Sequence, residues 1–469
     1  MTLYKRGEIM KSALEYFEEI MAIPRESGHE EKIANYLVNY AKENNIEYSL
    51  GKYNTVFLRK NNNSNKTIIL QAHSDMVCVS TNDYDFDNKG IPYYIEGDYY
   101  KAKNTSLGAD DGIGLSIILA ILQEQNNMPN IEVIVTTEEE TTMLGASNFD
   151  YSKITGNTLI SLDGITEGDI ESSSAGMCSL TINKKITYKE DNNLYKLLVS
   201  GLAGGHSGDD IHKYRCNAIK LAFKLLNQLD YRNIVDVNIG KKDNVIPSEG
   251  YIIFSSNKTL EELNNILSNI NIELNDDDKN LSLSIEKYNN NNKSIIESLD
   301  IYNFINDIKD GLLETYKEDN FPILSANIGK ISIKDNNLEI KYSIRSSNKE
   351  KEDNLLKEVK ELANKYNFEI NIDAKKPFFP FKEDSKIRKI LADSYKKLYD
   401  KETIIKKVHA CMEGGILSDN ISNLDICTIA PTIDNCHSVN ERVSISSTLR
   451  VYEWLKETLI EFNKLSDED

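Results

Sequence analysis

The sequence predicts an α/β fold in which a split domain with a central, mostly parallel sheet carries an inserted α+β domain. Three observations predict it. Apolar strand-like runs alternate with amphipathic helical runs up to about residue 186. Between there and about residue 380 the pattern is richer in strand-like runs. After about residue 380 the alternating pattern returns. We therefore assign residues 1–186 and 381–469 to the split domain and residues 187–380 to the insert, whose element order fits two βαββ-like halves.

In the first part of the chain, apolar side chains recur at helical spacing in two segments, and a third segment opens an apolar helix. Buried-type strands separate these helices. The expected elements are helices over 11–21, 30–44 and 107–122 and strands over 46–58, 67–72, 131–137 and 157–162. This alternation predicts a largely parallel sheet, and such sheets hold ligands at the carboxyl ends of their strands.

The same hydrophobic patterns predict the elements of the insert and of the second part of the split domain, residues 381–469. In the insert we expect strands over 194–202, 232–239, 250–255, 281–287, 323–331 and 338–345 and helices over 216–229, 258–271, 294–315 and 350–366. In the second part of the split domain we expect a helix over 384–399, strands over 403–408 and 424–430, and a last helix containing Leu449, Tyr452, Leu455, Leu459 and Phe462.

Length and composition exclude several classes of protein. The 469 residues suffice for two or three domains, and 40% hydrophobic residues allow a sizeable core. The net charge of −19 argues against nucleic acid or an anionic membrane as a partner. No apolar run approaches 18 residues, and the chain starts on an amphipathic stretch rather than an apolar signal core. The six cysteines form no CxxC pair, which indicates reduced thiols in a cytoplasmic protein.

Polar side chains follow the expected strands directly. His73 and Asp75 leave the strand 67–72 on one side because strand side chains alternate, and such a pair suits a metal ligand with an orienting carboxylate. Glu138, Glu139 and Glu140 follow the strand 131–137. Taken alone, a histidine near a strand end is more often polar surface, and an acidic triplet is usually a solvated turn.

Three more polar residues lie at the ends of expected elements, as His73 and Glu140 do. Asp110 lies just before a helix, where a cap is the simpler interpretation, Asp163 ends a strand, and His437 follows the strand 424–430. With His73 and Glu140 they would supply two imidazoles and three carboxylates at one sheet edge. This mixed set suits Zn²⁺ or Mn²⁺ better than Ca²⁺ or Mg²⁺. One carboxylate shared between two ions would give a two-metal hydrolytic site.

The ordered set of segments resembles the M20 metallopeptidase family, and most of all its aminoacyl-histidine dipeptidase branch (peptidase D, Xaa-His dipeptidase). The matching segments are 71–75, 106–112, 137–140, 161–163, 204–208, 408–415 and 437–442. Each motif alone is moderately specific, whereas the set in this order is highly specific. The resemblance implies a catalytic domain split around an inserted lid and dimerisation domain.

The resemblance also implies roles at the metal site. His73 and Asp163 bind one ion, Glu140 and His437 bind the other, and Asp110 bridges them. The two ions are expected to be Zn²⁺, with Mn²⁺ or Co²⁺ as alternatives. The two catalytic residues are Asp75, which orients His73, and Glu139, the general base. The spacing to Gly145 and Ala146 favours Glu139 and Glu140, rather than Glu138 and Glu139, as the functional pair.

Four further residues are expected to bind the substrate by the same resemblance. His206 steadies the oxyanion in a dimer partner's active site, Arg345 grips the substrate carboxylate, Glu413 lies near the free amine, and Asn327 helps the oxyanion or the carboxylate. The simpler interpretations are a flexible turn for His206 and a surface arginine for Arg345. Thr142, Cys411 and Val439 depart from common family residues, which bears on pocket shape.

The expected function is therefore a cytoplasmic, homodimeric, two-metal dipeptidase. It would cleave unblocked dipeptides of the Xaa-His type, including β-alanyl-histidine, with a broader dipeptide tolerance. One alternative is an N-acyl amino acid deacylase or a tripeptidase that uses the same site. Another is a catalytically silent binding relative that kept the fold.

Overall fold

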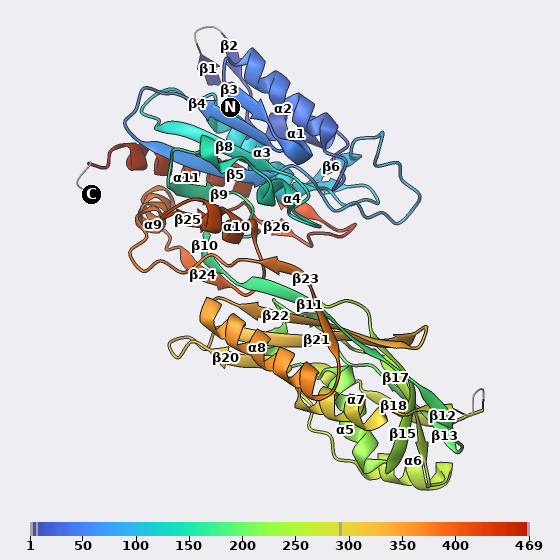
Figure 1. Ribbon diagram of the computed structural model, residues 1–469. Coiled ribbons are helices and arrows are strands. Elements are labelled where there is room, and N and C mark those ends of the chain that lie inside the picture. The colour runs from blue at the N-terminus through green and yellow to red at the C-terminus, as the bar shows by residue number, and fades with distance from the viewer. Residues whose placement is uncertain (1–2, 6–7, 290–292, 467–469) are drawn as a thin grey trace. The chain divides into compact units, whose positions relative to one another are not determined.

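The computed structural model describes residues 3–5, 8–289 and 293–466 and divides the chain into two compact units (Figure 1). Unit 1 comprises Met1–Ser173, Phe379–Lys407 and Glu413–Asp469, and unit 2 comprises Ser174–Phe378 and Val408–Met412. The change to unit 2 precedes strand β11 (Gly176–Lys185), although the sequence places this strand in the split domain. Strand β11 belongs to unit 2 because it pairs along its length with strand β22. The roles of the units as catalytic and lid domains stay predictions.

An eight-stranded sheet forms the centre of unit 1, in the order β24-β10-β25-β9-β5-β8-β4-β3. Its four central strands, β25, β9, β5 and β8, are parallel, and antiparallel strands extend the sheet beyond them. The strand bounds are β3 (Glu47–Leu50), β4 (Val56–Lys60), β5 (Thr67–His73), β8 (Asn130–Thr136), β9 (Thr158–Ser161), β10 (Asp169–Ser174), β24 (Ile404–Val408) and β25 (Asp425–Thr428). The predicted α/β class is confirmed, with a mixed sheet whose parallel part is central.

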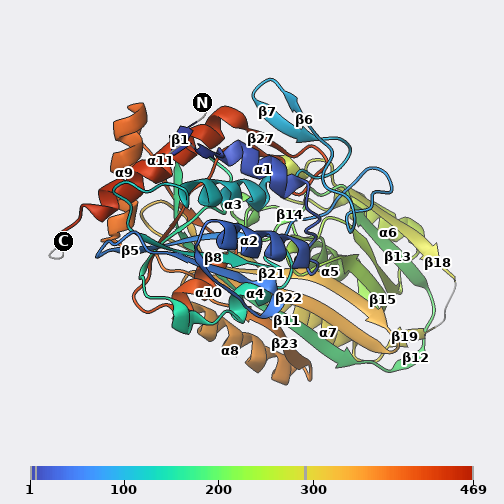
Figure 2. The same ribbon diagram turned by 90° about the horizontal axis from the view of Figure 1, so that it is seen from above.

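Helices pack on this sheet and bury one continuous apolar core. Helix α3 is buried on nearly every side, which agrees with its mostly apolar sequence after the two aspartates of its first turn. It lies beside α1 in both ribbon views (Figures 1 and 2). The helices of unit 1 are α1 (Ala13–Met21), α2 (Glu31–Glu43), α3 (Ala109–Ile121), α4 (Leu144–Ser147), α9 (Lys386–Tyr399), α10 (Glu413–Asn420) and α11 (Ile445–Asn463).

Two small sheets complete unit 1. One has the strand order β26-β27-β7-β6, and it joins the segment around His437 to a hairpin near residue 100. Its strands are β6 (Tyr93–Glu96), β7 (Tyr99–Ala102), β26 (Ile433–Asp434) and β27 (Arg442–Ser444). The other pairs β1 (Leu3–Lys5) with β2 (Glu8–Met10). No helix in the described part of the chain is long and apolar enough to cross a membrane.

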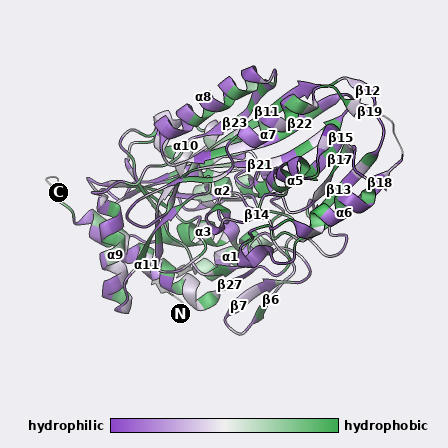
Figure 3. Cartoon of the chain, turned by 90° about the horizontal axis from the view of Figure 1, so that it is seen from below, coloured by the Kyte–Doolittle hydropathy of each residue, from purple (hydrophilic) through white to green (hydrophobic). Residues whose placement is uncertain are grey.

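Unit 2 is built on a nine-stranded antiparallel sheet, in the order β18-β13-β17-β15-β21-β22-β11-β23, with β20 paired to β21. Its helices bury a second core against this sheet. Figure 3 shows α8 with hydrophilic and hydrophobic stripes, as expected for an amphipathic surface helix.

The strands of the main sheet of unit 2, besides β11, are β13 (Leu194–Ser200), β15 (Tyr231–Gly240), β17 (Gly250–Ser256), β18 (Ser282–Tyr288), β20 (Gly311–Thr315), β21 (Pro322–Lys334), β22 (Asn337–Ser346) and β23 (Glu369–Lys376). Short strands are β12 (Tyr188–Glu190), β14 (Gly205–His206), β16 (Val245–Ile246) and β19 (Lys293–Ile295). The helices are α5 (Ala218–Gln228), α6 (Leu260–Asn269), α7 (Ser298–Asp307) and α8 (Lys349–Lys365).

The predicted helix over 294–315 is wrong. Only α7 is helical there, and strands β19 and β20 flank it. Apolar residues continue at helical spacing through this stretch, but Ile308 is extended and Gly311 has a φ of +86°. The chain therefore leaves the helix, and β20 pairs with β21 instead.

Candidate active site

The predicted metal ligands lie at the carboxyl edge of the central sheet of unit 1. His73 is the last residue of β5, Glu140 follows the end of β8, and Asp163 lies two residues beyond the end of β9. Asp110 lies at the start of α3, and His437 lies in the turn before β27. Because β5, β8 and β9 are parallel, their carboxyl ends meet at one edge, which brings these side chains together.

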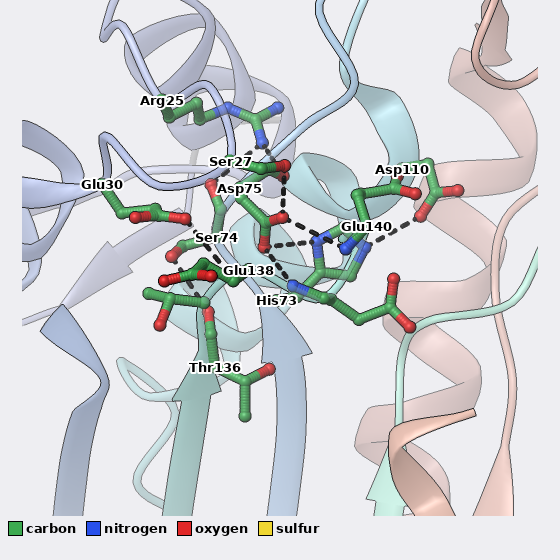
Figure 4. A network of polar contacts seen from close by, with 12 residues as sticks. Arg25, Ser27, Glu30, His73, Ser74, Asp75, Asp110, Thr136, Glu138 and Glu140 are labelled. Carbon is green, nitrogen blue, oxygen red and sulfur yellow. Dashed lines mark hydrogen bonds and ion pairs between the residues drawn. The ribbon is translucent and has the colours of Figure 1, made fainter. Parts of the chain in front are cut away.

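Asp110 stands between the two imidazoles. Its Oδ1 lies 3.1 Å from His73 Nε2, and its Oδ2 lies 3.2 Å from His437 Nε2. Asp163 Oδ1 lies 3.6 Å from His73 Nε2, and Glu140 Oε1 lies 2.7 Å from His437 Nε2. Two groups of potential ligand atoms therefore share Asp110, and within each group the atoms lie within 4.8 Å of one another. Figure 4 shows Asp110 beside His73, with Glu140 close to both.

This donor set fits two divalent cations. In each group an imidazole nitrogen and carboxylate oxygens lie close enough to one another to bind a single metal ion. Burial raises the pKa of Asp163 to about 6, and hydrogen bonding with Asp110 and Glu140 raises the pKa of His437 to about 10. Titratable groups with perturbed pKa values in one cluster are a typical feature of functional sites. Positive charge at both places would offset the repulsion between the carboxylates.

Asp75 connects the end of β5 to the turn that follows β8. This buried carboxylate accepts hydrogen bonds from the Glu139 N–H at 3.1 Å, the Glu140 N–H at 3.2 Å and the Ser27 hydroxyl at 2.7 Å. Its Oδ1 also lies 3.4 Å from His73 Nδ1 (Figure 4). Asp75 therefore fixes both the imidazole and the backbone that carries the neighbouring acidic residues.

The three consecutive glutamates have two different environments. Glu138 has a φ of +54°, and its carboxylate accepts a hydrogen bond from the Thr142 hydroxyl. Glu139 and Glu140 instead offer ligand atoms near His73. Burial and the nearby Asp163 carboxylate raise the pKa of Glu139 well above its usual range. A carboxylate with a raised pKa beside a ligand cluster is suited to accept and return a proton.

Glu413, the first residue of α10, is almost completely buried in unit 1. Its Oε2 accepts hydrogen bonds from the Gln71 amide, at 2.9 Å, and from the Thr136 hydroxyl. Its buried Oε1 has no hydrogen-bond partner among the described residues. Burial raises the pKa of Glu413 to about 8. The unpaired oxygen is free to accept a hydrogen bond from a bound ligand.

The other predicted substrate residues lie in unit 2. His206 Nδ1 lies 3.0 Å from Asp209 Oδ2, and its Nε2 lies 3.5 Å from Arg345 Nη2. Arg345 is 4% exposed and lies on β22, so the simpler interpretation as a surface arginine does not hold. Its Nε lies 3.4 Å from the Ser207 hydroxyl. These long contacts leave the guanidinium able to pair with an anion.

Asn327 has a different environment from the one expected. Its amide nitrogen donates to two backbone carbonyls, Asp243 O at 2.8 Å and Val245 O at 2.9 Å. Both N–H groups are therefore used within the protein. This geometry favours a structural role for Asn327, which holds the segment around β16, over a contact with an oxyanion.

The predicted site omits a loop between α1 and α2. Ser27 donates to Asp75, and Glu30 accepts hydrogen bonds from the backbone N–H groups of Gly28 and Glu138 (Figure 4). The signal in the sequence was the polar run Arg-Glu-Ser-Gly-His-Glu, residues 25–30, between two amphipathic helices. Hydrophobic periodicity does not distinguish such a run from an ordinary loop, so the predicted site did not include these residues.

Known proteins similar to this chain include metallopeptidases and dipeptidases. Residues 69–461 match the model of peptidase family M20/M25/M40. The chain belongs to this family. This M20 peptidase is 31% identical, over 95% of its length and 96% of the relative's, to the cytosol non-specific dipeptidase of Escherichia coli (strain K12).

Solved structures agree with the family assignment. The aminoacylhistidine dipeptidase from Vibrio alginolyticus is similar to this M20 member with a TM-score of 0.84 and 28% identity, over 96% of each chain. A tripeptidase from Staphylococcus aureus has a TM-score of 0.61 at 15% identity, over 97% of this chain and 98% of that chain. The second likeness shows the fold alone. The predicted family, the fold class and a peptide hydrolase are confirmed.

Proposed function

We propose that this protein hydrolyses the peptide bond of unblocked dipeptides with two divalent cations. The observation that carries this proposal is the position of Asp110, whose two oxygens face the imidazoles of two separate ligand groups, with Glu139 beside them. The likeness over nearly the whole chain to proteins named as dipeptidases supports the choice of substrate class.

We assign His73, Asp110 and Asp163 to one cation and Asp110, Glu140 and His437 to the other. When bound, such cations polarise a carbonyl group and lower the pKa of a water molecule. Glu139 accepts the proton of the attacking water and returns it to the leaving amine. Asp75 holds His73 and the backbone of Glu139 in place for these steps. The mixed nitrogen and oxygen donor set favours Zn²⁺, with Mn²⁺ or Co²⁺ as alternatives.

The substrate's ends are assigned to two further residues. The unpaired Oε1 of Glu413 would accept a hydrogen bond from the substrate's ammonium group and so select an unblocked amine. The Arg345 guanidinium would pair with the substrate carboxylate, because its fork matches a carboxylate. His206 would steady the oxyanion. We propose substrates of the Xaa-His type, including β-alanyl-histidine, with tolerance for other dipeptides.

We also propose that the protein works in the cytoplasm as a homodimer. The cytoplasmic assignment is supported by the cysteine pattern and by the name of the Escherichia coli relative, a cytosol dipeptidase. The dimer rests on resemblance, because relatives that dimerise through the inserted domain bring the equivalent of His206 to the partner's active site.

The first experiment is the release of free histidine from β-alanyl-histidine and from leucyl-histidine. Protein loaded with Zn²⁺ or Mn²⁺ is compared with a chelated sample and with Glu139→Ala. We expect release that depends on the metal and vanishes in both controls. Cleavage of N-acetyl amino acids in place of dipeptides would identify a deacylase, and turnover of tripeptides alone would identify a tripeptidase. No turnover of any of these substrates by the loaded protein would contradict the proposal.

A further inference from the structure

The carboxylate of Glu441 holds the loop that carries Asp110. Its Oε2 accepts hydrogen bonds from the Leu107 N–H at 2.8 Å and the Gly108 N–H at 3.0 Å. Its Oε1 accepts from the Ala109 N–H at 2.8 Å and the Asp110 N–H at 3.3 Å. One buried carboxylate therefore collects four successive backbone donors, which end at the residue shared by both ligand groups.

Arg25 holds the same loop through its carbonyl side. Its guanidinium donates to Gly108 O and also to Ser74 O at 3.1 Å and Asp75 O at 2.8 Å. Figure 4 shows Arg25 beside Ser74 and Asp75. The Gly108 peptide group is thus bound from both sides, because Glu441 accepts from its N–H and Arg25 donates to its oxygen.

Two glycines make room for this arrangement. A Cβ atom on Gly108 or on Gly112 would lie 2.5 Å from Arg25 Nη2, closer than any side chain can approach. Gly108 also has a φ of +70°, which favours glycine. The Arg25 side chain is completely buried. The loop's sequence is therefore fitted to the guanidinium as well as to its own turn.

Together these contacts join three segments that carry ligands. Arg25 connects the end of β5, which bears His73, to the Asp110 loop, and Glu441 connects that loop to the segment that bears His437. We propose that Glu441 and Arg25 are positioning residues that fix Asp110 between the two imidazoles and so determine how tightly this protein holds its pair of cations. The proposal rests on the proposed metal centre.

The geometry explains why the loop needs such restraint. Asp110 must present one oxygen to His73 and the other to His437 at nearly equal distances, so a small rotation of its backbone would spoil both contacts at once. Residues that orient metal ligands in other proteins typically change metal affinity about 10- to 100-fold when they are replaced. A residue that only stabilised the fold would leave the affinity of the folded protein unchanged.

The test is titration of the metal-free protein with Co²⁺, with stoichiometry and affinity measured by calorimetry and ligand geometry by visible absorption. The variant is Glu441→Gln, which has nearly the same shape but leaves two of the four N–H groups facing an amide NH₂. We expect at least a tenfold loss of Co²⁺ affinity and an altered absorption spectrum. A folded Glu441→Gln protein that binds two Co²⁺ ions with the wild-type affinity and spectrum would overturn the inference.

Glu132→Gln is the matched control. Glu132 on β8 is also a buried carboxylate, and it accepts hydrogen bonds from the Thr155 and Gly156 N–H groups at 3.0 and 3.1 Å. It lies near the other end of its strand, so we expect its replacement to lower stability without changing Co²⁺ binding. An equal loss of Co²⁺ affinity in Glu132→Gln would show a general effect of destabilisation and would also overturn the inference.

A second variant, Arg25→Lys, covers the case in which Glu441→Gln does not fold. Lysine keeps the charge but cannot reach three carbonyls with a planar fork. We expect weaker Co²⁺ binding and an altered absorption spectrum here too, and wild-type values would overturn the inference. If the wild-type protein bound no pair of Co²⁺ ions, the proposed metal centre itself would fail, which separates that failure from a failure of the positioning role.

Discussion

The Gln71 amide donates a hydrogen bond of 2.9 Å to Glu413 Oε2 and thereby joins strand β5 to the start of α10. The Thr136 hydroxyl from the end of β8 donates to the same oxygen. With Oε2 occupied, Glu413 is oriented so that Oε1 is the oxygen available to a ligand. Two strands of the central sheet therefore set the direction of this carboxylate.

We predict that Glu413→Gln raises the KM for unblocked dipeptides about 10- to 100-fold, because a hydrogen bond to a charged group contributes about 1.5–3 kcal/mol. Steady-state kinetics with leucyl-histidine provide the measurement. Gln71→Met should shift KM in the same direction by a smaller factor, since the Thr136 hydroxyl still holds Oε2. An unchanged KM in Glu413→Gln would remove this residue from amine recognition.

Replacement of the proposed base should separate catalysis from metal binding. We predict that Glu139→Gln lowers kcat about 10²- to 10⁴-fold, the range that general bases contribute. Its content of bound cations, measured by atomic emission after dialysis, should match the wild-type protein. Glu138→Gln is the neighbouring control, because the Glu138 carboxylate bonds Thr142 instead of lying in the ligand groups. Equal losses of activity in both variants would contradict the assignment.

Cation binding should stabilise the folded protein. A ligand at about 100 times its Kd adds about 2.7 kcal/mol per site to the free energy of unfolding. We therefore expect the midpoint of urea unfolding to rise when Zn²⁺ or Mn²⁺ is added and to fall with a chelator. Asp110→Asn should lose most of this effect, because the shared residue would no longer offer two carboxylate oxygens. The same metal-dependent shift in the variant would count against a shared ligand.

The fourth prediction concerns His409, which is buried in unit 2 with its Nε2 2.7 Å from the Ser325 hydroxyl. Burial, together with the charge of Arg345, lowers the pKa of His409 to about 3. Between pH 3 and about 6.5 the unfolded chain therefore binds the proton more readily than the folded protein does. Stability contributed by this neutral imidazole falls as the pH falls through that interval, by about 2 kcal/mol between pH 7 and pH 5.

His409→Gln isolates this effect, because glutamine can keep the bond to Ser325 and does not titrate. Urea unfolding of both proteins at pH 7 and pH 5 provides the measurement, and the variant should lose less stability at pH 5. The comparison is needed because the half-buried Asp310 acts in the opposite sense. Burial raises its pKa to about 6, so it contributes stability as the pH falls from 6 towards 3.8. Identical pH dependences would show that His409 does not titrate as proposed.

Local patterns were sufficient to predict that most of the proposed metal ligands lie close together in the fold. The alternation of side chains along β5 predicted that His73 and Asp75 leave the strand together, and Asp75 Oδ1 lies 3.4 Å from His73 Nδ1. The parallel arrangement of β5, β8 and β9 then brought their ends to one edge, as the alternation of strands and helices predicted. These predictions held because strand geometry and sheet direction depend on residues close in sequence.

Long-range contacts explain where the structure departs from the local patterns. The substrate role of Asn327 stays a prediction, and the carbonyls of Asp243 and Val245, contributed by another segment, accept hydrogen bonds from its amide. The helical spacing over 294–315 was overruled by pairing of β20 with β21. Strand β11 joined the sheet of unit 2 because its partners β22 and β23 lie there. In each case the partner was far along the chain, so periodicity carried no information about it.

The sequence by itself determined the family, the α/β class and the residue types at the end of each strand. The tertiary structure decided which donors face one another and what restrains them. Glu441 reaches the loop of Asp110 across more than 300 residues, and Arg25 reaches Gly108 across more than 80. Such contacts have no local signature, because a buried charge is satisfied by whichever backbone groups folding brings to it.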